Sequence, residues 1–493
     1  MIVKPDLDSH SEIPLYRQLS RHFAELIASG KLGVGERLPA TRELAGLLRL
    51  NRTTVSAAYE RLEADGLIAG QVGRGSFVTG TAESKRDGPN WDSALRPVFA
   101  VQPPPSAPLF GGVPLSFANS RPSEKLFPLD DFRESAQEVM DAPDFSSVLQ
   151  LGSPGGYEPL RQFLLAEARR EGTAGPEDDL LMANGCQQAL DLIGTVLVGP
   201  GDRVALEDPV FPGLKNVFLQ AGAALSGVPV GREGMEPDQL DRVIANGPPK
   251  LLMIIPNFQN PTGATIPLAA RQLILRAARD AGSIIVENDI YGPLRYEGEA
   301  LPTLKQMDES GRTVLLRSFS KIAFPGLRVG WVIGPRPLIA RLTQAKQLCD
   351  LHTGQFSQAV LLRFAQSGRM ARHQARMLQA GAERLGAVLR ACEKYLPKGA
   401  RFSRPQGGMN VWVTLPEPLD AAEILPRAQR EGVTYLPGRF FGVARTHSNE
   451  LRLSFAGLTP EQIDRGVGLL GKVFAGELEA RRASDREPAL AMV

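Results

Sequence analysis

The sequence has little of what would place it outside the cytoplasm. Its 493 residues include only three cysteines, Cys186, Cys349 and Cys392, and no Cys-x-x-Cys pair. This usage argues against a disulfide framework and against structural zinc, so we expect no metal site. No apolar run approaches the ~18 residues that a membrane span needs, and the N-terminus lacks a basic stretch followed by an apolar one. We therefore expect a cytoplasmic protein that is neither exported nor embedded in a membrane.

A strong net charge is also missing. The formal net charge is +2, so bulk charge neither requires nor excludes a nucleic-acid partner. No internal repeat suggests a solenoid. The chain is too long for one compact core, and its length predicts two to four domains. DNA binding can therefore be inferred only from local patterns.

Three short helical segments occur near the N-terminus. Apolar residues at helical spacing lie within residues 14–30, a second stretch covers 42–48, and Asn51 is placed to cap a third that ends before Gly66. Only residues 49–50 separate the last two. This is helix-turn-helix geometry, in which the start of the later helix enters the DNA major groove. Residues 67–68 and 76–78 flank a Gly-Arg-Gly turn and predict a hairpin wing.

Arginines lie where this module would meet DNA, at the helix starts and at the wing tip. Residues in such places contact phosphates or base edges. We predict DNA contacts from Arg42, Arg52, Thr53, Thr54, Arg74 and Gly75. The alternative is a small helical dimerisation or protein-interaction domain, in which the Gly-Arg-Gly segment is only a turn.

These patterns divide the chain into four parts. We predict a DNA-binding domain over residues 12–80, a proline-rich linker over 81–114, a large domain over 115–475 and a C-terminal tail over 476–493. Proline density makes the linker a semi-rigid, extended spacer.

The large domain alternates short apolar runs with helical stretches. The runs cover residues 203–206, 251–255, 283–286, 314–316 and 329–333, and they lack polar alternation. Such runs are typical of a mostly parallel α/β sheet that is covered on both faces. Ligand-binding residues collect in the loops after the strands of these sheets.

One segment after these runs carries cofactor chemistry. Ser318, Ser320 and Lys321 follow an apolar run, and Arg328 comes seven residues after the lysine. Lysine can form a Schiff base with an aldehyde cofactor, while serine and arginine supply the donors that a phosphate needs. The segment predicts a pyridoxal-phosphate site. The alternative is that Lys321 is a solvated loop lysine.

Other loops supply matching residues in order along the chain. Gly185, Cys186 and Gln187 begin a helix whose N–H groups can bind phosphate. Phe211 offers a ring that could stack on a pyridine, although an isolated phenylalanine is more often core. Asn260 lies on a Pro-Gly turn, and Tyr291 could hydrogen-bond to a ring hydroxyl.

The N-terminal motifs closely resemble the GntR-type winged helix. They are Pro-Leu-Tyr-Arg-Gln-Leu at 14–19, Gly-Glu-Arg-Leu-Pro-Ala-Thr-Arg-Glu-Leu-Ala at 35–45, Asn-Arg-Thr-Thr-Val at 51–55 and Ala-Tyr-Glu-Arg-Leu-Glu at 58–63. Ala40 stands where that family usually has a serine that forms a capping box with the residue here numbered Glu43. Thr41 is then the alternative cap, which leaves the helix start open by one residue.

The larger set resembles the fold-type-I aminotransferases, which implies an α/β domain with a smaller C-terminal α+β subdomain. In that resemblance Lys321 is the catalytic lysine that carries pyridoxal 5'-phosphate, Phe211 stacks on it, and Asn260 and Tyr291 contact the ring oxygen. The phosphate is held by Gly185, Cys186, Gln187, Ser318 and Arg328. Arg452 pairs with a substrate or effector carboxylate, and a loop with Gly156 and Tyr157 meets the substrate.

One position departs from this family. An aspartate three residues before the tyrosine normally keeps the pyridine nitrogen protonated, so that the ring can act as an electron sink. Here Asn288 occupies that position and Asp289 follows it. Neighbouring side chains on a strand face opposite ways. Either a local shift brings Asp289 to the ring, or an amide faces the nitrogen and weakens the sink.

Together the modules resemble the MocR/GabR family of transcriptional regulators over about residues 14–471. That resemblance implies a head-to-tail homodimer that binds operator DNA and uses pyridoxal phosphate as effector, alone or with an amino acid or amine. Transamination would then be slow or vestigial. The main alternative is an active aminotransferase with an incidental or autoregulatory N-terminal module. A third possibility is a fused scaffold with neither activity.

Overall fold

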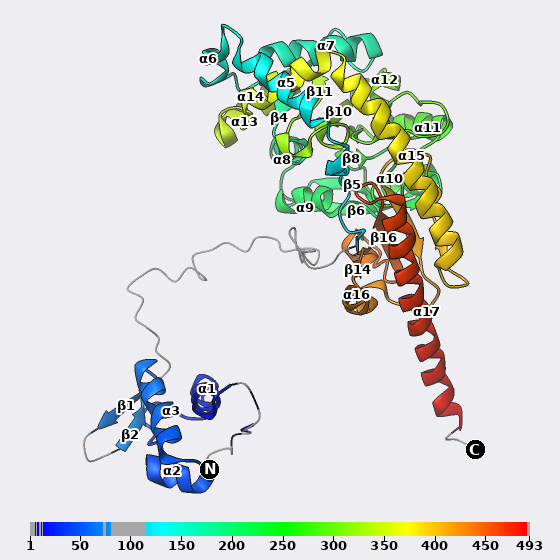
Figure 1. Cartoon of the computed structure of the whole chain (residues 1–493). Helices are drawn as coiled ribbons and strands as arrows, with labels where there is room; N and C mark the ends of the chain where they lie inside the picture. Colours follow the sequence, from blue (N-terminus) through cyan, green and yellow to red (C-terminus); the bar gives the residue numbers. More distant parts are fainter. Residues whose placement is uncertain are drawn as a thin grey trace. The chain divides into compact units, whose positions relative to one another are not determined.

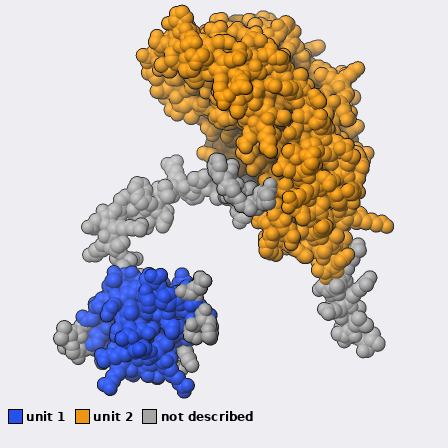
Figure 2. Space-filling view, in the orientation of Figure 1, with its two compact units in different colours: residues 1–97 blue, residues 98–493 orange. Residues whose placement is uncertain are grey.

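The computed structural model describes residues 5, 7–8, 11, 13–71, 75–79 and 115–490. The chain divides into two compact units, residues 1–97 and 98–493 (Figure 1 and Figure 2). The predicted linker at 81–114 lies outside the described residues, and so does Arg74.

The first unit is a three-helix module with a hairpin. It contains α1 (Leu15–Ala28), α2 (Thr41–Leu48), α3 (Arg52–Ala64) and the antiparallel pair β1 (Ile68–Gln71) and β2 (Gly75–Val78). The apolar stripes of the helices meet in one buried cluster that includes Leu19, Phe23, Leu44, Val55 and Leu62. The predicted helices and wing are therefore confirmed.

The two helix starts differ in their caps. The Asn51 side chain accepts a hydrogen bond from the Thr53 backbone N–H at 3.2 Å, as predicted for the start of α3. Helix α2 begins at Thr41, and Ala40 holds the cap position without a side-chain hydrogen bond. The alternative that Thr41 caps is wrong, because Thr41 is already the first helical residue. Arg49 has a φ of 56° and turns the chain from α2 toward α3.

The second unit is built around an eight-stranded sheet in the order β4-β11-β10-β9-β8-β5-β6-β7. Neighbours from β10 through β6 are parallel, whereas β11 is antiparallel to both of its neighbours. The strands are β4 (Asp178–Ala183), β5 (Arg203–Asp208), β6 (Ala224–Gly231), β7 (Gly234–Met235), β8 (Leu251–Ile254), β9 (Ile284–Asn288), β10 (Thr313–Ser318) and β11 (Gly330–Pro335).

Both faces of this sheet are buried, which explains the continuous apolar runs. In β8, Leu251 and Met253 belong to one core cluster, while Leu252 and Ile254 belong to the cluster on the opposite face. Helices flank the sheet: α5 (Leu129–Met140), α6 (Phe145–Val148), α7 (Glu158–Glu171), α8 (Cys186–Leu197), α9 (Pro212–Gln220), α10 (Pro237–Ala245), α11 (Leu268–Asp280), α12 (Leu304–Met307), α13 (Arg336–Asp350) and α14 (Gln355–Gln366).

A smaller C-terminal part carries its own core. Its sheet order is β12-β13-β16-β15, and a separate parallel pair joins β14 to β3. Its elements are β3 (Leu115–Ser116), α15 (Arg369–Tyr395), β12 (Arg401–Phe402), β13 (Asn410–Thr414), α16 (Ala421–Arg430), β14 (Val433–Thr434), β15 (Leu436–Pro437), β16 (Glu450–Ser454) and α17 (Pro460–Leu490). Figure 1 shows α17 beside α15, and both contribute to this core.

Helix α17 runs across the boundary predicted between residues 475 and 476, so the expected tail begins inside this helix. None of the helices in the described part of the chain has the length and apolar character needed to cross a bilayer.

Candidate functional site

A cavity of about 570 Å³ gathers most of the residues that the sequence singled out. Its size falls within the range of small-molecule sites. It lies beside the ends of β8, β9 and β10, where an α/β sheet is expected to bind ligands. From the predicted set, the cavity is lined by Cys186, Gln187, Phe211, Asn260, Asn288, Tyr291, Ser318, Ser320, Lys321, Arg328 and Arg452.

One end of the cavity is suited to a phosphate. Gly185 precedes α8 with a φ of 80°, and a Cβ on it would overlap with the Arg328 guanidinium. Glycine therefore lets the guanidinium lie against the helix N-terminus. Ser318 continues this end, where its Oγ accepts a hydrogen bond from Ser320 N–H at 2.9 Å. Backbone N–H groups, a hydroxyl and a guanidinium are the donors that bind phosphate.

Lys321 lies at the end of η3 (Phe319–Lys321), directly after β10. Its Nζ donates a hydrogen bond to the backbone carbonyl of Ser120 at 2.6 Å and lies 5.7 Å from the centre of the Tyr291 ring. The lysine is thus directed by the fold into the cavity rather than solvated in a loop. Cys186 lies nearby, and burial raises the pKa of its thiol to about 12, so that it stays protonated at neutral pH.

A chain of hydrogen bonds crosses the cavity wall. Asn260 donates from Nδ2 to the Tyr291 hydroxyl at 3.1 Å, and its Oδ1 accepts from Arg452 Nη1 at 2.9 Å. Arg452 is 2% exposed, and burial lowers its pKa to about 10. Its Nη2 donates to the backbone carbonyl of Ala118, and its Nε has no partner among the described residues. Its guanidinium lies 5.2 Å from the centre of the Phe441 ring. This cation is charged at neutral pH, and none of its contacts with described residues is a carboxylate.

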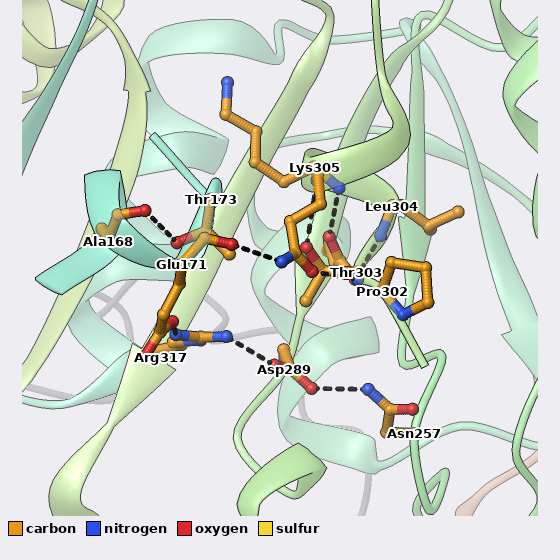
Figure 3. A network of polar contacts seen from close by, with 12 residues as sticks. Ala168, Glu171, Thr173, Asn257, Asp289, Pro302, Thr303, Leu304, Lys305 and Arg317 are labelled. Atoms are coloured by element: carbon orange, nitrogen blue, oxygen red, sulfur yellow. Dashed lines mark hydrogen bonds and ion pairs between the residues drawn. The ribbon is translucent and has the colours of Figure 1, made fainter. Parts of the chain in front are cut away.

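The amide of Asn288, not the carboxylate of Asp289, lines the cavity. Asn288 Oδ1 is buried and has no hydrogen-bond partner among the described residues. Asp289 instead accepts from Asn257 Nδ2 at 2.8 Å and from Arg317 Nη2 at 3.3 Å (Figure 3). The sequence left open whether a local shift brings Asp289 to the cavity or whether Asn288 faces it. In the structure Asn288 faces the cavity, because neighbouring side chains on a strand point in opposite directions.

Two residues of the predicted set lie elsewhere in the single chain. Gly156 packs against Met182, and the Tyr157 backbone N–H donates to Gln358 Oε1 at 2.9 Å. Neither residue lines the cavity. Within one chain this loop lies outside the cavity lining, and its contact with a ligand stays a prediction.

The predicted DNA contacts cluster at helix starts of the first unit. Arg42 lies in the first turn of α2, and Arg52 and Thr53 open α3. All three are exposed, whereas Thr54 is half-buried. Neither Arg42 nor Arg52 forms an ion pair with a described residue. Gly75 begins β2 with a φ of 102°, which favours glycine.

Sequence reasoning missed a segment that forms one wall of the cavity. Ala118, Asn119, Ser120 and Arg121 follow β3 and all line the cavity, although about 200 residues separate them from Lys321. The segment has neither periodicity nor a recognisable motif. Only the arginine in a short polar stretch before Pro122 could have drawn attention to it.

A buried ionic cluster was also missed beside the cavity. His447 Nε2 lies 2.9 Å from Asp208 Oδ1, and its Nδ1 lies 2.5 Å from Glu450 Oε2. Burial alone would lower the pKa of His447, but the hydrogen bonds to both carboxylates raise it above its ordinary value. Burial alone would raise the pKa values of Asp208 and Glu450. Their contacts with His447 nevertheless keep both pKa values below the ordinary values of these groups. The cluster joins the end of β5 to the start of β16, which carries Arg452.

Comparisons with known proteins agree with both units. Residues 115–470 match the family model for aminotransferase class I and II, and residues 15–78 match the model for bacterial regulatory proteins of the gntR family. The expected fold class is confirmed: an N-terminal winged helix-turn-helix joined to a fold-type-I aminotransferase domain.

Relatives include regulators and enzymes. The chain is 30% identical over 491 residues to the uncharacterised HTH-type transcriptional regulator YdfD of Bacillus subtilis, covering 97% of this chain and 99% of that protein. It is 35% identical over 372 residues to aromatic-amino-acid aminotransferase 1 of Thermococcus litoralis, covering 74% of this chain and 89% of that protein. The crystal structure of LysN, the alpha-aminoadipate aminotransferase of Thermus thermophilus complexed with N-(5'-phosphopyridoxyl)-L-leucine, superposes with a TM-score of 0.73. Its sequence identity is 34%, over 80% of this chain and all of that one.

Proposed function

Because this chain belongs to the aminotransferase class I and II family and is a GntR-type transcriptional regulator of MocR-type architecture, we propose that pyridoxal 5'-phosphate is its effector, alone or with an amino compound. The helix-turn-helix domain implies DNA binding. The observation that carries the proposal is the single cavity that unites Lys321 with the phosphate cradle at Arg328 and the buried cation Arg452.

The residues present fit this cofactor. Lys321 would hold its aldehyde carbon covalently, the N-terminus of α8 with Ser318 and Arg328 would bind its phosphate, and Phe211 would cover its ring. Asn260 and Tyr291, which are hydrogen-bonded to each other, would contact its ring oxygen. When bound, the cofactor supplies an aldehyde that reacts reversibly with amines and a ring that can withdraw electrons.

Asn288 favours a regulator over a fast enzyme. Its amide lines the cavity and would meet the ring nitrogen, whereas a carboxylate there would keep that nitrogen protonated. Binding of an amine requires only the aldehyde, whereas turnover also needs the electron sink. We therefore propose that amino compounds bind at this site while transamination stays slow.

The same contacts connect the cavity to the segment that follows β3. Lys321 and Arg452 both donate to backbone carbonyls of the segment that follows β3, at Ser120 and Ala118. Covalent use of Lys321 would remove the first contact, because its nitrogen would then be bonded to the cofactor, and a carboxylate at Arg452 would compete with the second. Since β3 is the first described element of this unit, occupancy would change the segment by which the chain enters it. We propose that this biases the placement of two winged helices on their half-sites.

A head-to-tail homodimer is part of the proposal. The loop with Gly156 and Tyr157 does not reach the cavity of its own chain. Beside that loop lie exposed apolar side chains, including Leu149, Leu151 and Phe356, around a hollow of about 340 Å³. A second copy packed on this face would cover the apolar side chains and bring the loop to the partner's cavity.

An active aminotransferase is the second candidate, because the set that would bind cofactor and substrate carboxylate is nearly complete. One experiment separates the two functions. Full-length protein is tested for binding to its own upstream DNA and to random DNA, with and without pyridoxal phosphate and amino acids, while steady-state transamination is measured in parallel. We expect preference for the upstream DNA, a response to the cofactor or amino acid, and slow turnover. No preference with fast turnover would favour the enzyme.

A further inference from the structure

The cavity is lined by four cationic side chains and by no carboxylate of the described residues. The cations are Lys321, Arg328, Arg452 and Arg121, and the lining residues include neither aspartate nor glutamate. Partners of the first three are neutral. Lys321 donates to a backbone carbonyl, Arg328 donates to the carbonyls of Pro325 and Asn184, and Arg452 donates to a carbonyl and an amide oxygen. No carboxylate among the described lining residues therefore balances the positive charge of the cavity.

Three of these cations have a ligand group assigned to them by the proposed function. Lys321 holds the aldehyde, Arg328 lies at the phosphate, and Arg452 pairs with the carboxylate next to the reacting amine. Arg121 remains. Its side chain is exposed and forms no hydrogen bond or ion pair with a described residue, while its backbone N–H bonds to Asn119 at 3.0 Å and holds the local turn.

A second observation points to a polar ligand group at the same wall. Ser120 Oγ is buried, belongs to a residue that lines the cavity and has no hydrogen-bond partner among the described residues. A buried hydroxyl without a partner is unusual, since burial of such a group costs free energy unless a hydrogen bond is formed. A ligand oxygen near Ser120 and Arg121 would satisfy both.

We propose that Arg121 determines specificity at this site by pairing with a second acidic group, so that the effector is an amino acid with an acidic side chain. The inference rests on the proposed function, because it assumes that an amino compound binds beside the cofactor. A neutral amide of the same shape would place no charge against Arg121. Because Arg121 is exposed, its ion pair should give a moderate preference that weakens as salt is added.

The test uses full-length protein loaded with pyridoxal phosphate. The change in cofactor absorbance is titrated with L-glutamate, L-glutamine, L-aspartate and L-asparagine at low and at high salt. The same titrations are run on Arg121→Gln, and on Arg401→Gln as the control, since Arg401 is an exposed arginine of β12 that does not line the cavity.

We expect at least one acid to bind about fivefold more tightly than its amide, a ratio typical of a partly exposed ion pair. Arg121→Gln should reduce the preference to about twofold or less and weaken its dependence on salt, whereas Arg401→Gln should keep both. Equal binding of acid and amide, or a preference that survives in Arg121→Gln, would overturn the role of Arg121 but leave the proposed function intact. If the loaded protein responds to none of these four amino acids, the inference fails, and the proposed function fails with it only if a wider panel of amino acids and amines is also without effect.

Discussion

Arg317 donates from Nη2 to Asp289 Oδ2 at 3.3 Å and thereby holds this carboxylate on the side of β9 away from the cavity. Arg317 also pairs with Glu171 at 2.6 Å (Figure 3). Asp289 is 3% exposed, and moving it toward the cavity would break its contacts with Arg317 and Asn257. A shift of Asp289 to a bound cofactor would therefore leave the half-buried Arg317 with Glu171 as its remaining ionic partner and would break two contacts of the buried Asp289 carboxylate, which is costly.

Asn288→Asp should turn the site toward catalysis. A carboxylate in the cavity would favour the protonated ring nitrogen and restore the electron sink. We expect steady-state transamination to rise about tenfold or more, which corresponds to about 1.4 kcal/mol of barrier, with little change in cofactor affinity. Turnover by the unmodified protein at the ~1–10³ per second usual for enzymes would contradict this and favour the aminotransferase alternative.

Lys321→Ala should remove covalent attachment of the cofactor. The variant should lack the visible absorbance of the lysine-bound cofactor, and borohydride should trap no cofactor on the protein. Lys398→Ala, which changes an exposed lysine outside the cavity, should behave as the unmodified protein. Because the helix-turn-helix belongs to a separate unit, Lys321→Ala should still bind DNA but lose its response to effector. Cofactor trapped on another lysine would rule out Lys321.

Arg52→Ala should weaken binding to the upstream DNA. If the exposed Arg52 side chain at the start of α3 neutralises a phosphate, its loss should reduce the slope of log affinity against log salt by about 1. Arg21→Ala is the matched control, because Arg21 is an exposed arginine of α1, outside the two helices of the helix-turn-helix. Equal salt slopes for the two variants would argue against the assigned DNA face.

Cofactor binding should loosen the segment after β3. We expect amide hydrogen exchange at residues 118–121 to speed up when pyridoxal phosphate binds, because Ser120 loses the hydrogen bond from Lys321 Nζ. A binding amino acid would take the aldehyde from Lys321 and free its amine, so its addition should reverse the effect at Ser120. If exchange is unchanged while the spectrum shows bound cofactor, cofactor binding does not change the conformation of residues 118–121, and this segment does not transmit the effect of the cofactor.

Because of the cluster around His447, the stability of the second unit should fall both when the pH is raised and when it is lowered. The folded pKa of His447 is raised, so its contribution is complete below about pH 6.5 and is lost as pH rises through the folded value. Asp208 and Glu450 have lowered pKa values, so their contribution is lost as pH falls through those values. His447→Gln should cost about 3–5 kcal/mol near pH 6 and remove the alkaline decline, as measured by thermal unfolding between about pH 5 and 9. An unchanged alkaline slope would exclude this histidine as its cause.

The sequence by itself determined the elements and most of the residues that meet in the cavity. Helical spacing predicted α1 and α3, and continuous apolar runs predicted β5, β8, β9, β10 and β11 with both faces of the sheet covered. Lys321 and Arg328 could be recognised because they lie in one short segment, whose local geometry the neighbouring residues specify.

Tertiary structure decided what depends on contacts between distant segments. The choice between Asn288 and Asp289 needed Arg317 and Asn257, and the wall at Ser120 and Arg121 comes from a part of the chain about 200 residues from Lys321. Local patterns report which backbone a segment prefers and which face it buries. They do not report which distant carbonyl or carboxylate packing will bring against it, because that depends on how the whole sheet and the C-terminal part close around the cavity.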